Sequence, residues 1–493
     1  MAGSLDISTR LGAVRGLRDD GVRTWRGIPF AAPPVGSLRF RAPQPPQPWP
    51  GIRDATSFGP VAPQDRRGPF GGANAKTPRN EDCLTLNIIA PDDSREALPV
   101  MVYIHGGAYS VGSPADLPFR GVNFVRRGAI HVTFNYRLNA FGYVDFSEYG
   151  FDNNLGLRDQ VAALEWVRDN IADFGGDPTN VTIYGESSGA NAVTTLLATP
   201  AAGGLFARAI AQSPPSNAVY RPDVTRQWAR EFMELLGVAP GGEAEALRSR
   251  PTDELVTAAR LLFARIPDQY PGDQAFSPVV DGDYLPQHPV DAIRDGNAHP
   301  VPLIIGTNDR EGSVFFGRRR ILATTPSRIT GLLGNTSPAG ATRMRATYRM
   351  PSRRGSLDFG GDFAFWFPSY QIAQYHSAVQ TTWHYRLDYA PPLVKLVGID
   401  ATHGSDLLTV FGRTHSVVGR LMTLLGGAKK LAAVSESMQE YWFRFAVDGT
   451  VDGSWPSYDT EARATLVFDS PNRVEPDSRS DRRHAWDDFI HMH

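Results

Sequence analysis

One stretch in the first half of the chain alternates strand and helix patterns, and this alternation constrains the fold more than any other feature of the sequence. Residues 130–138 (IHVTFNYRL) and 180–185 (NVTIYG) are short apolar runs rich in β-branched and aromatic residues, which is typical of buried strands. Between them, apolar residues recur at helical spacing over 156–172 until Gly175 ends the pattern, and a second helix is predicted over 190–199. Alternating strands and helices predict an α/β fold with a mostly parallel sheet that helices cover on both faces.

Other segments extend the predicted sheet and supply further helices. Short apolar runs that end in turn residues predict strands at 84–91, 100–107, 208–213, 301–308 and 381–389. Two segments, 223–265 and 427–446, are helical by pattern. The stretch 64–80 (QDRRGPFGGANAKTPRN) is polar and glycine-rich with little to bury, so a surface loop is expected there.

Charge and cysteine content narrow the classes of function and the compartment. Lys and Arg number 50 against 52 Asp and Glu, and the net charge of -2 offers no general attraction to nucleic acid or to an anionic membrane. Apolar runs stay far below the roughly 18 residues of a membrane span, and the sequence shows no apolar or amphipathic segment suited to a lipid surface. Cys83 is the only cysteine, which excludes an intramolecular disulfide, and the N-terminus lacks a signal-peptide pattern. Both observations favour a cytoplasmic location.

A candidate nucleophile lies at the boundary between the second predicted strand and the second predicted helix. Gly185, Ser187 and Gly189 satisfy the G-x-S-x-G pattern, and no such glycine frame centres on the neighbouring Ser188. A sharp strand-to-helix turn would hold the Ser187 hydroxyl above the sheet, with the glycines removing clashes. The backbone N–H of Ser188 would then lie at a helix N-terminus, where it can donate to a developing oxyanion. The pattern therefore predicts different roles for the two serines.

Candidate acids and a candidate base follow Ser187 in the chain order that such a turn requires. A polar loop after the strand at 301–308 carries two carboxyl groups, Asp309 and Glu311. His403 lies in a polar loop before a predicted helix, close to a third carboxyl group on Asp406. Two other histidines, His288 and His299, precede the acid, and two more, His376 and His384, lie in helix-like and strand-like stretches.

Small residues that can approach an oxyanion follow an earlier strand. The segment 103–112 (YIHGGAYSVG) ends a strand at His105 and continues with Gly106, Gly107 and Ala108. Backbone N–H groups of such residues can donate closely to a carbonyl oxygen. A nucleophile, a base, an acid and an oxyanion loop in the required order indicate acyl transfer by a serine hydrolase.

With these motifs the chain resembles the type B carboxylesterases, a family of the α/β-hydrolase fold. The resemblance covers nearly the whole chain and rests on these segments in this order: RGIPFAAPPVGSLRF, NEDCLTLNI, HGGAYSVG, FNYRLNAFGY, NLGLRDQVAALEWVRDNIADFGGDP, GESSGA, GTNDREGSVFF and HGSDLLTVFG. It implies a central, mostly parallel sheet flanked by helices in a single domain over 1–493, with helical insertions at roughly 215–300 and 320–380.

The resemblance also implies the roles of individual residues. The implied set is Ser187 as nucleophile, Glu311 as acid and His403 as base, with Gly107, Ala108 and Ser188 as oxyanion-hole donors and Gly106, Glu186 and Ser213 in support. It implies no metal or organic cofactor, a small-molecule ester as partner, and a monomer or homodimer that binds neither nucleic acid nor a membrane.

Three positions depart from the family pattern. The family has alanine after the nucleophile, and Ser188 adds a hydroxyl there; because the N–H is kept, little effect is expected. Cys83 lacks the upstream partner of secreted members, which predicts a buried free thiol after a more mobile loop. Gln212-Ser213-Pro214 replaces the usual QSG, which changes the expected path of that loop.

The sequence thus predicts a carboxylic ester hydrolase that works through an acyl-enzyme. Carbamates, amides and thioesters are alternative substrates for the same groups, and a neuroligin-like interaction protein is the alternative from another class. The aromatic-rich stretches 363–370 and 141–146 could supply apolar walls for short- to medium-chain and aryl esters, although each ring could equally belong to the core. Long-chain triglycerides are expected to be poor substrates.

Overall fold

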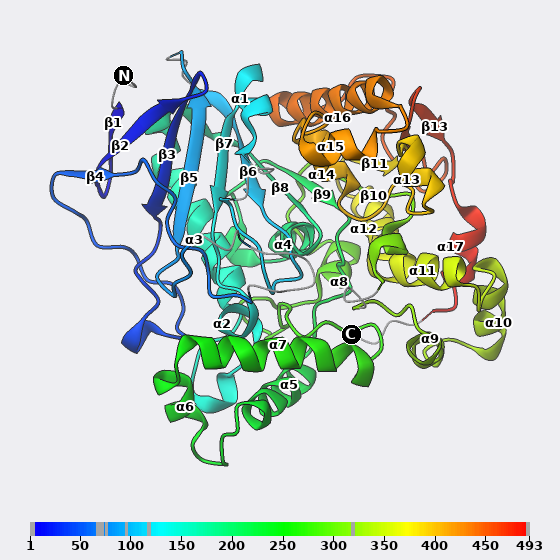
Figure 1. Ribbon diagram of the computed structural model, residues 1–493, viewed down its shortest axis with the longest axis horizontal. Helices are drawn as coiled ribbons and strands as arrows, with labels where there is room; N and C mark the ends of the chain where they lie inside the picture. The colour runs from blue at the N-terminus through cyan, green and yellow to red at the C-terminus, as the bar shows by residue number, and fades with distance from the viewer. Residues whose placement is uncertain are drawn as a thin grey trace.

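A computed structural model of the protein describes residues 5–65, 73, 77–93, 97–115, 120–316 and 321–489. Its central feature is one sheet, in which thirteen strands are found within these ranges (Figure 1). The strands are β1 (Leu5–Thr9), β2 (Gly12–Asp19), β3 (Val22–Pro29), β4 (Ile52–Asp54), β5 (Thr85–Pro91), β6 (Leu98–Ile104), β7 (Ile130–Phe134), β8 (Gly176–Glu186), β9 (Arg208–Gln212), β10 (Leu303–Asn308), β11 (Thr382–Leu387), β12 (Thr465–Phe468) and β13 (Arg473–Glu475).

The sheet is parallel in its centre and antiparallel at both edges. Its order is β1-β2-β3-β5-β7-β6-β8-β9-β10-β11-β12-β13, with β4 paired to β2. From β7 to β12 every neighbouring pair is parallel, whereas β1, β2, β3 and β5 run antiparallel and β13 pairs antiparallel with β12. The predicted α/β fold with a mostly parallel sheet is confirmed. Parallel central strands bring their carboxyl ends to one edge, where loops that follow different strands meet.

Helices flank the sheet and fill two long connections. Four helices lie between β9 and β10 and four more between β10 and β11 in the described part of the chain. The helices are α1 (Val122–Arg127), α2 (Asn139–Tyr143), α3 (Leu155–Asn170), α4 (Ser188–Leu197), α5 (Pro222–Leu235), α6 (Glu243–Ser249), α7 (Thr252–Gln269), α8 (Pro289–Arg294), α9 (Pro326–Leu333), α10 (Pro338–Thr347), α11 (Arg353–Gly361), α12 (Phe367–His376), α13 (Pro392–Leu396), α14 (Ser405–Val410), α15 (Val417–Met422), α16 (Ala428–Asp448) and α17 (Ser480–Trp486).

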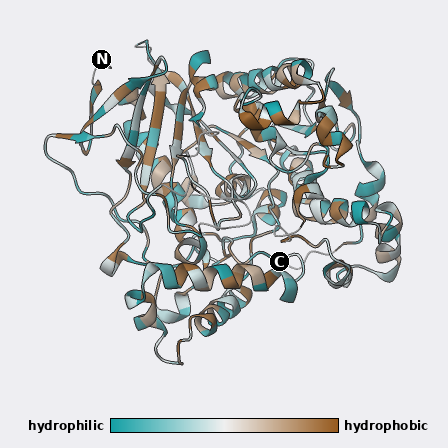
Figure 2. Cartoon of the chain, viewed as in Figure 1, coloured by the Kyte–Doolittle hydropathy of each residue, from teal (hydrophilic) through white to brown (hydrophobic). Residues whose placement is uncertain are grey.

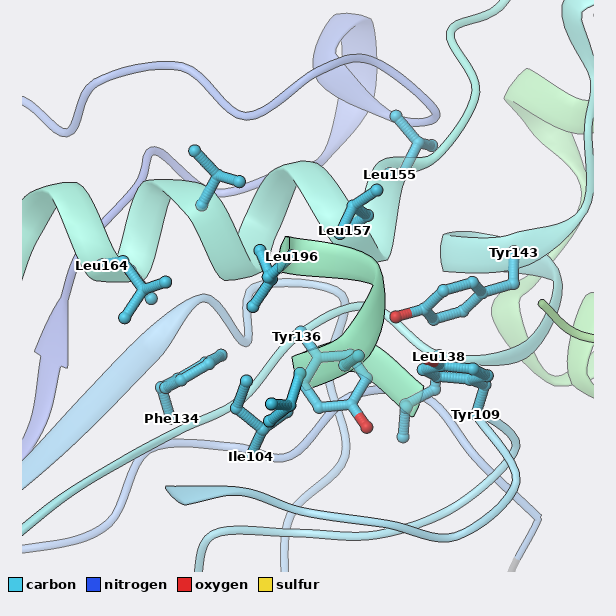
Figure 3. Close-up of a cluster of buried hydrophobic side chains, with 14 of the residues drawn as sticks. Ile104, Tyr109, Phe134, Tyr136, Leu138, Tyr143, Leu155, Leu157, Leu164 and Leu196 are labelled. Carbon is cyan, nitrogen blue, oxygen red and sulfur yellow. The ribbon is translucent and has the colours of Figure 1, made fainter. Parts of the chain in front are cut away.

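The largest core cluster lies on the face of the sheet that α3 and α4 cover. Figure 3 shows side chains from β6, β7, α3 and α4 gathered there, among them Ile104, Phe134, Leu164 and Leu196. All four are fully buried. Because the buried strands are apolar on both faces, a second cluster forms between the opposite face and α14 and α16. The two clusters pack against opposite faces of the sheet and so stabilise the edge where the carboxyl ends of the parallel strands meet.

Several strands were not predicted from the sequence, and one predicted loop lies partly outside the residues that the structure describes. The strands β1 to β4, β12 and β13 were not predicted. Of the expected surface loop at 64–80, residues 66–72 and 74–76 lie outside the described ranges. Cys83 is a buried free thiol, as predicted. Within the described ranges, no helix combines the length and the apolar character needed to cross a membrane.

Candidate active site

Ser187 lies on the sharp turn between β8 and α4. Its backbone has φ 59° and ψ −128°, a conformation that residues other than glycine rarely adopt. A Cβ on Gly189 would lie 2.0 Å from the carbonyl oxygen of Ile104, and one on Gly185 would lie 2.5 Å from the backbone of Gly189. The two glycines therefore let α4 start directly against β6 and β8. This packing holds the strained Ser187 in place at the start of the helix.

His403 connects Ser187 to Glu311. Its Nε2 lies 2.9 Å from Ser187 Oγ and its Nδ1 lies 2.7 Å from Glu311 Oε2. A carboxylate can only accept a hydrogen bond, so Nδ1 carries the proton and the Nε2 of neutral His403 accepts from the serine hydroxyl. The three side chains come from the loops after β8, β10 and β11. They form a relay that can deprotonate Ser187.

Glu311 is held by buried polar groups on the side away from His403. The hydroxyl of Ser213 donates to its Oε1 at 2.6 Å, and the backbone N–H and side-chain amide of Asn308 donate to the same oxygen at 2.5 and 3.1 Å. Ser213 itself has φ 52°, so the altered Gln212-Ser213-Pro214 loop still turns its hydroxyl toward the acid. These donors fix the carboxylate in one orientation.

The two rival carboxyl groups have other partners. Asp309 accepts from Arg479 at 2.8 Å and does not contact His403. Asp406 is fully buried and accepts from the side chains of Gln212 and Tyr385 at 2.8 and 3.1 Å. Of the three carboxyl groups that the residues alone left open as the acid, only Glu311 has a hydrogen bond to His403 in the described part of the chain.

The glycine loop after β6 faces Ser187 across a short gap. Within the described ranges, the backbone N–H groups of Gly107, Ala108 and Ser188 donate to no protein acceptor. The Ser188 hydroxyl accepts from the backbone N–H of Tyr109 at 3.2 Å and so ties the start of α4 to this loop. Sequence reasoning missed this contact, because it expected nothing of the extra hydroxyl. Gly106 lies against Glu186, since a Cβ there would be 2.5 Å from the carbonyl oxygen of Glu186.

Glu186 and His403 influence each other's protonation. The carboxylate of Glu186 lies 3.3 Å from His403 Nε2, and its burial raises its pKa from 4.5 to about 8. Burial alone would lower the pKa of His403, but the carboxylates of Glu186 and Glu311 outweigh it and raise this pKa from 6.5 to about 9. The relay therefore favours a protonated imidazole, the form that develops when Ser187 loses its proton.

A cavity of about 220 Å³ opens onto Ser187 and His403. Its walls are mainly apolar and come from Pro215, Phe315, Ile321, Leu322, Phe365 and Leu407, with Gln274 as the neutral polar exception. Phe365 stacks on the imidazole of His403 with ring centroids 4.2 Å apart. It lies in a π-helical turn (Asp362–Trp366), a distortion that often marks a functional site.

The aromatic stretches contribute unequally to these walls. Phe365 belongs to the stretch 363–370, while the described residues that line the cavity include none from 141–146. Phe141, Tyr143 and Phe146 are buried in the core instead. The described residues hold no group of three or more His, Cys, Asp and Glu side chains that could bind a metal ion.

Comparisons with known proteins agree with this geometry. A profile of the Carboxylesterase family matches residues 3–330. The chain is 36% identical over 491 residues to para-nitrobenzyl esterase from Bacillus subtilis, with 97% of each chain covered, and 34% identical over 475 residues to fumonisin B1 esterase from Sphingopyxis macrogoltabida, with 92% of this chain and 84% of the relative covered. A solved para-nitrobenzyl esterase structure superposes with a TM-score of 0.87 at 34% identity, covering 97% of this chain and 99% of that one. The chain belongs to the carboxylesterase family and is a carboxylic ester hydrolase.

Proposed function

We propose that Ser187 is the nucleophile, His403 the general base and acid, and Glu311 the group that orients His403. The observation that carries this proposal is the hydrogen-bond relay of the three side chains, which opens onto an apolar cavity. Ser187 Oγ attacks the ester carbonyl carbon while its proton passes to His403 Nε2. The N–H groups of Gly107, Ala108 and Ser188 donate to the oxyanion that forms, which is consistent with their having no acceptor among the described residues.

The acyl-enzyme then forms and is hydrolysed by the same groups. The bond from the carbonyl carbon to the alcohol oxygen breaks, and His403 gives its proton to the departing alcohol. A water molecule next loses a proton to His403 and attacks the acyl carbon. The carboxylic acid leaves as Ser187 Oγ regains the proton. Each turnover consumes one water and releases one alcohol and one acid.

The substrates that fit this site best are uncharged esters with short to medium acyl chains or aryl groups. The cavity walls are apolar, and the described lining residues carry charge only at Glu186 and His403. At about 220 Å³ the cavity is smaller than the roughly 300–1,000 Å³ of sites for drug-sized ligands. The relative named para-nitrobenzyl esterase also supports an aryl or aralkyl ester.

Labelling with a fluorophosphonate, which reacts with activated serines, tests the assignment. The wild type and Ser188→Ala should be labelled, whereas Ser187→Ala should not. Steady-state rates on para-nitrophenyl acetate should fall by about 10⁶-fold in Ser187→Ala. Ser188→Ala should keep at least a tenth of the activity, because it keeps the backbone N–H of residue 188 and loses only the contacts of its hydroxyl with Tyr109 and Tyr136. Equal losses in the two variants would contradict the assignment.

A further inference from the structure

A face formed by α13, α15 and the residues just after each of them exposes an unusual number of large apolar side chains. We call it the α13–α15 face; its exposed apolar members are Leu396 (74%), Val397 (60%), Val417 (65%), Val418 (58%), Leu421 (53%), Leu424 (68%) and Leu425 (57%). They are seven of the fourteen large apolar residues that are exposed in the described part of the chain. Figure 2 shows the ribbons of α13 and α15 largely brown. The sequence, in which no apolar or amphipathic segment suited to a lipid surface was found, did not indicate these exposed side chains.

The apolar side chains are exposed because of the way α15 lies on the protein. Gly419 is buried, and a Cβ there would lie 2.1 Å from the carbonyl oxygen of Thr414. Ser416 caps the helix by accepting from the N–H of Gly419. The helix therefore packs through its smallest residue and turns Val417, Val418 and Leu421 to the outside. A monomeric protein seldom leaves such a contiguous apolar area uncovered.

The segments that form and follow this face are rich in positive charges and poor in carboxyl groups. Residues 407–435 contain no Asp or Glu but four cations, and Lys395 on α13 adds a fifth. Within the described ranges, none of the five forms an ion pair; they are Lys395, Arg413, Arg420, Lys429 and Lys430. The chain has four lysines, Lys76, Lys395, Lys429 and Lys430, so three of the four border this face.

Of the carboxyl groups that flank these segments in the chain, Asp406 is fully buried against Gln212 and Tyr385, and the others are paired with arginines. Asp388 contacts Arg386 and Arg473, Asp400 contacts Arg310, and Glu436 contacts Arg127. They leave the positive charge of the face uncompensated.

Two of these lysines lie at the N-terminus of a helix, where positive charge is unfavourable. Lys429 and Lys430 lie in the first turn of α16, which has no acidic residue there. Positive charge at a helix N-terminus interacts unfavourably with the helix dipole. These lysines therefore reduce the stability of α16, and an attraction outside the helix offers a physical reason for their position.

The combination of apolar side chains and unpaired cations indicates which kind of partner binds the α13–α15 face. A second copy of the chain on a two-fold axis would bring five cations toward five cations, which opposes association. An anionic lipid surface satisfies both features, because apolar side chains enter the boundary between headgroups and acyl chains while lysines and arginines meet the headgroups. We propose that the α13–α15 face binds the protein peripherally to anionic lipid surfaces.

Sedimentation with lipid vesicles tests this proposal on the full chain. The wild type should bind vesicles of phosphatidylcholine with about 30 mol % phosphatidylglycerol at least tenfold more tightly than vesicles of phosphatidylcholine alone. The anionic lipid gives the vesicle surface a negative potential that attracts the cations of the face. Binding should weaken as salt rises, because exposed charges are screened. The double variants Leu421→Ser/Leu424→Ser and Lys429→Glu/Lys430→Glu should each lose at least tenfold in affinity, with unchanged hydrolysis of para-nitrophenyl acetate in solution.

Matched controls separate this face from general surface effects. Ile52→Ser and Val379→Ser remove apolar side chains that are exposed by 48% and 49% elsewhere, and Arg444→Glu reverses a charge farther along α16. All three should bind the anionic vesicles like the wild type. Equal binding to both kinds of vesicle, no binding to either, or equal losses in the control variants would overturn the proposal. So would a dimer in sedimentation velocity that Leu421→Ser/Leu424→Ser dissociates, because the occupant would then be a second copy.

Discussion

Three carboxyl groups, Asp309, Glu311 and Asp406, are candidates for the acid that orients His403, and their partners distinguish them. Glu311 contacts Nδ1 of His403 at 2.7 Å, whereas Asp309 pairs with Arg479 and Asp406 with Gln212. Glu311→Gln keeps the size of the side chain but lets its amide donate, which favours the wrong tautomer of His403. We predict a loss in kcat of roughly 10⁴-fold on para-nitrophenyl acetate.

The rival carboxyl groups supply the controls for this prediction. Asp309→Asn should keep nearly full activity, since Asp309 does not contact His403. Asp406→Asn should cost less activity than Glu311→Gln, because the hydrogen bonds of Asp406 reach Glu311 through Asn308, whereas Glu311 contacts His403 directly. A greater loss in either aspartate variant would assign the acid to that residue.

Glu186 should set the pH at which the base becomes active. His403 must be neutral to accept the serine proton, so kcat/KM rises with pH as the imidazole deprotonates. The carboxylates of Glu186 and Glu311 raise the pKa of His403 above its ordinary value of 6.5. Glu186→Gln removes one of these charges, and we predict that the rising limb of the profile moves to lower pH.

The measurement is kcat/KM on an uncharged ester from about pH 5 to about pH 10. Glu254→Gln on α7 is the control, because Glu254 is exposed and paired with Arg250. Its profile should match that of the wild type. A midpoint in Glu186→Gln that stays in place or rises would show that Glu186 does not raise the His403 pKa.

At this scale the sequence predicted residue types better than it predicted contacts. The glycine frame identified Ser187, and the order of motifs identified His403. The choice among Asp309, Glu311 and Asp406 could be inferred only from the family resemblance, because it depends on how the loops after β10 and β11 meet. The contact from Tyr109 N–H to Ser188 Oγ joins two loops far apart in sequence, so no local pattern could have indicated it.

The elements around Glu311 are packed backbone against backbone. Glu311 begins a short 3₁₀ turn (Glu311–Val314), and α11 lies directly against it. A Cβ on Gly312 would lie 1.8 Å from the carbonyl oxygen of Leu357. We predict that Gly312→Ala forces α11 and the turn apart, lowers stability by about 1–3 kcal/mol and lowers kcat because Glu311 moves away from His403.

Thermal unfolding and steady-state kinetics on the same sample check this prediction. Gly453→Ala is the control, since a Cβ at Gly453 has no atom within 4 Å and its backbone needs no positive φ. It should leave both quantities unchanged. If Gly312→Ala kept the kcat of the wild type, the close packing of α11 would not be what positions Glu311.

The elements that the sequence predicted are those with a strong local pattern. Fully buried strands such as β5 and β7 read as continuous apolar runs, and α3 has a clear helical period. The N-terminal strands escaped prediction because edge strands are only partly buried. In β1 the residues alternate between half-buried and exposed, and β2 and β3 carry several arginines. They are joined to the sheet through β3, which pairs with β5, and such long-range pairing leaves little trace in a local window.

For the whole molecule, average composition hid an uneven distribution of charge. A net charge of -2 gave no reason to expect attraction to an anionic surface. In the folded chain Asp388, Asp400 and Glu436, which flank the α13–α15 face in the chain, pair with arginines, and in the ranges that the structure describes five cations of these segments form no ion pair. Net charge predicts solubility and bulk attraction, but the folded arrangement determines which faces are charged.

Binding to a lipid surface and selectivity for short acyl chains are compatible, because different parts of the molecule determine them. No described residue of the α13–α15 face lines the cavity, whereas Leu322, Phe315 and Phe365 form part of its apolar wall. We predict that kcat/KM on para-nitrophenyl esters, measured from acetate to palmitate, is highest for short to medium chains and that an emulsified triglyceride without anionic lipid is hydrolysed poorly. Leu322→Ala removes part of the cavity wall and so enlarges the cavity, which should shift the maximum of kcat/KM toward longer acyl chains. Leu424→Ser on the α13–α15 face should not shift this maximum. A maximum at palmitate, or a jump in rate once the substrate forms an interface, would mean that the cavity does not limit the acyl chain and that the enzyme acts as a lipase.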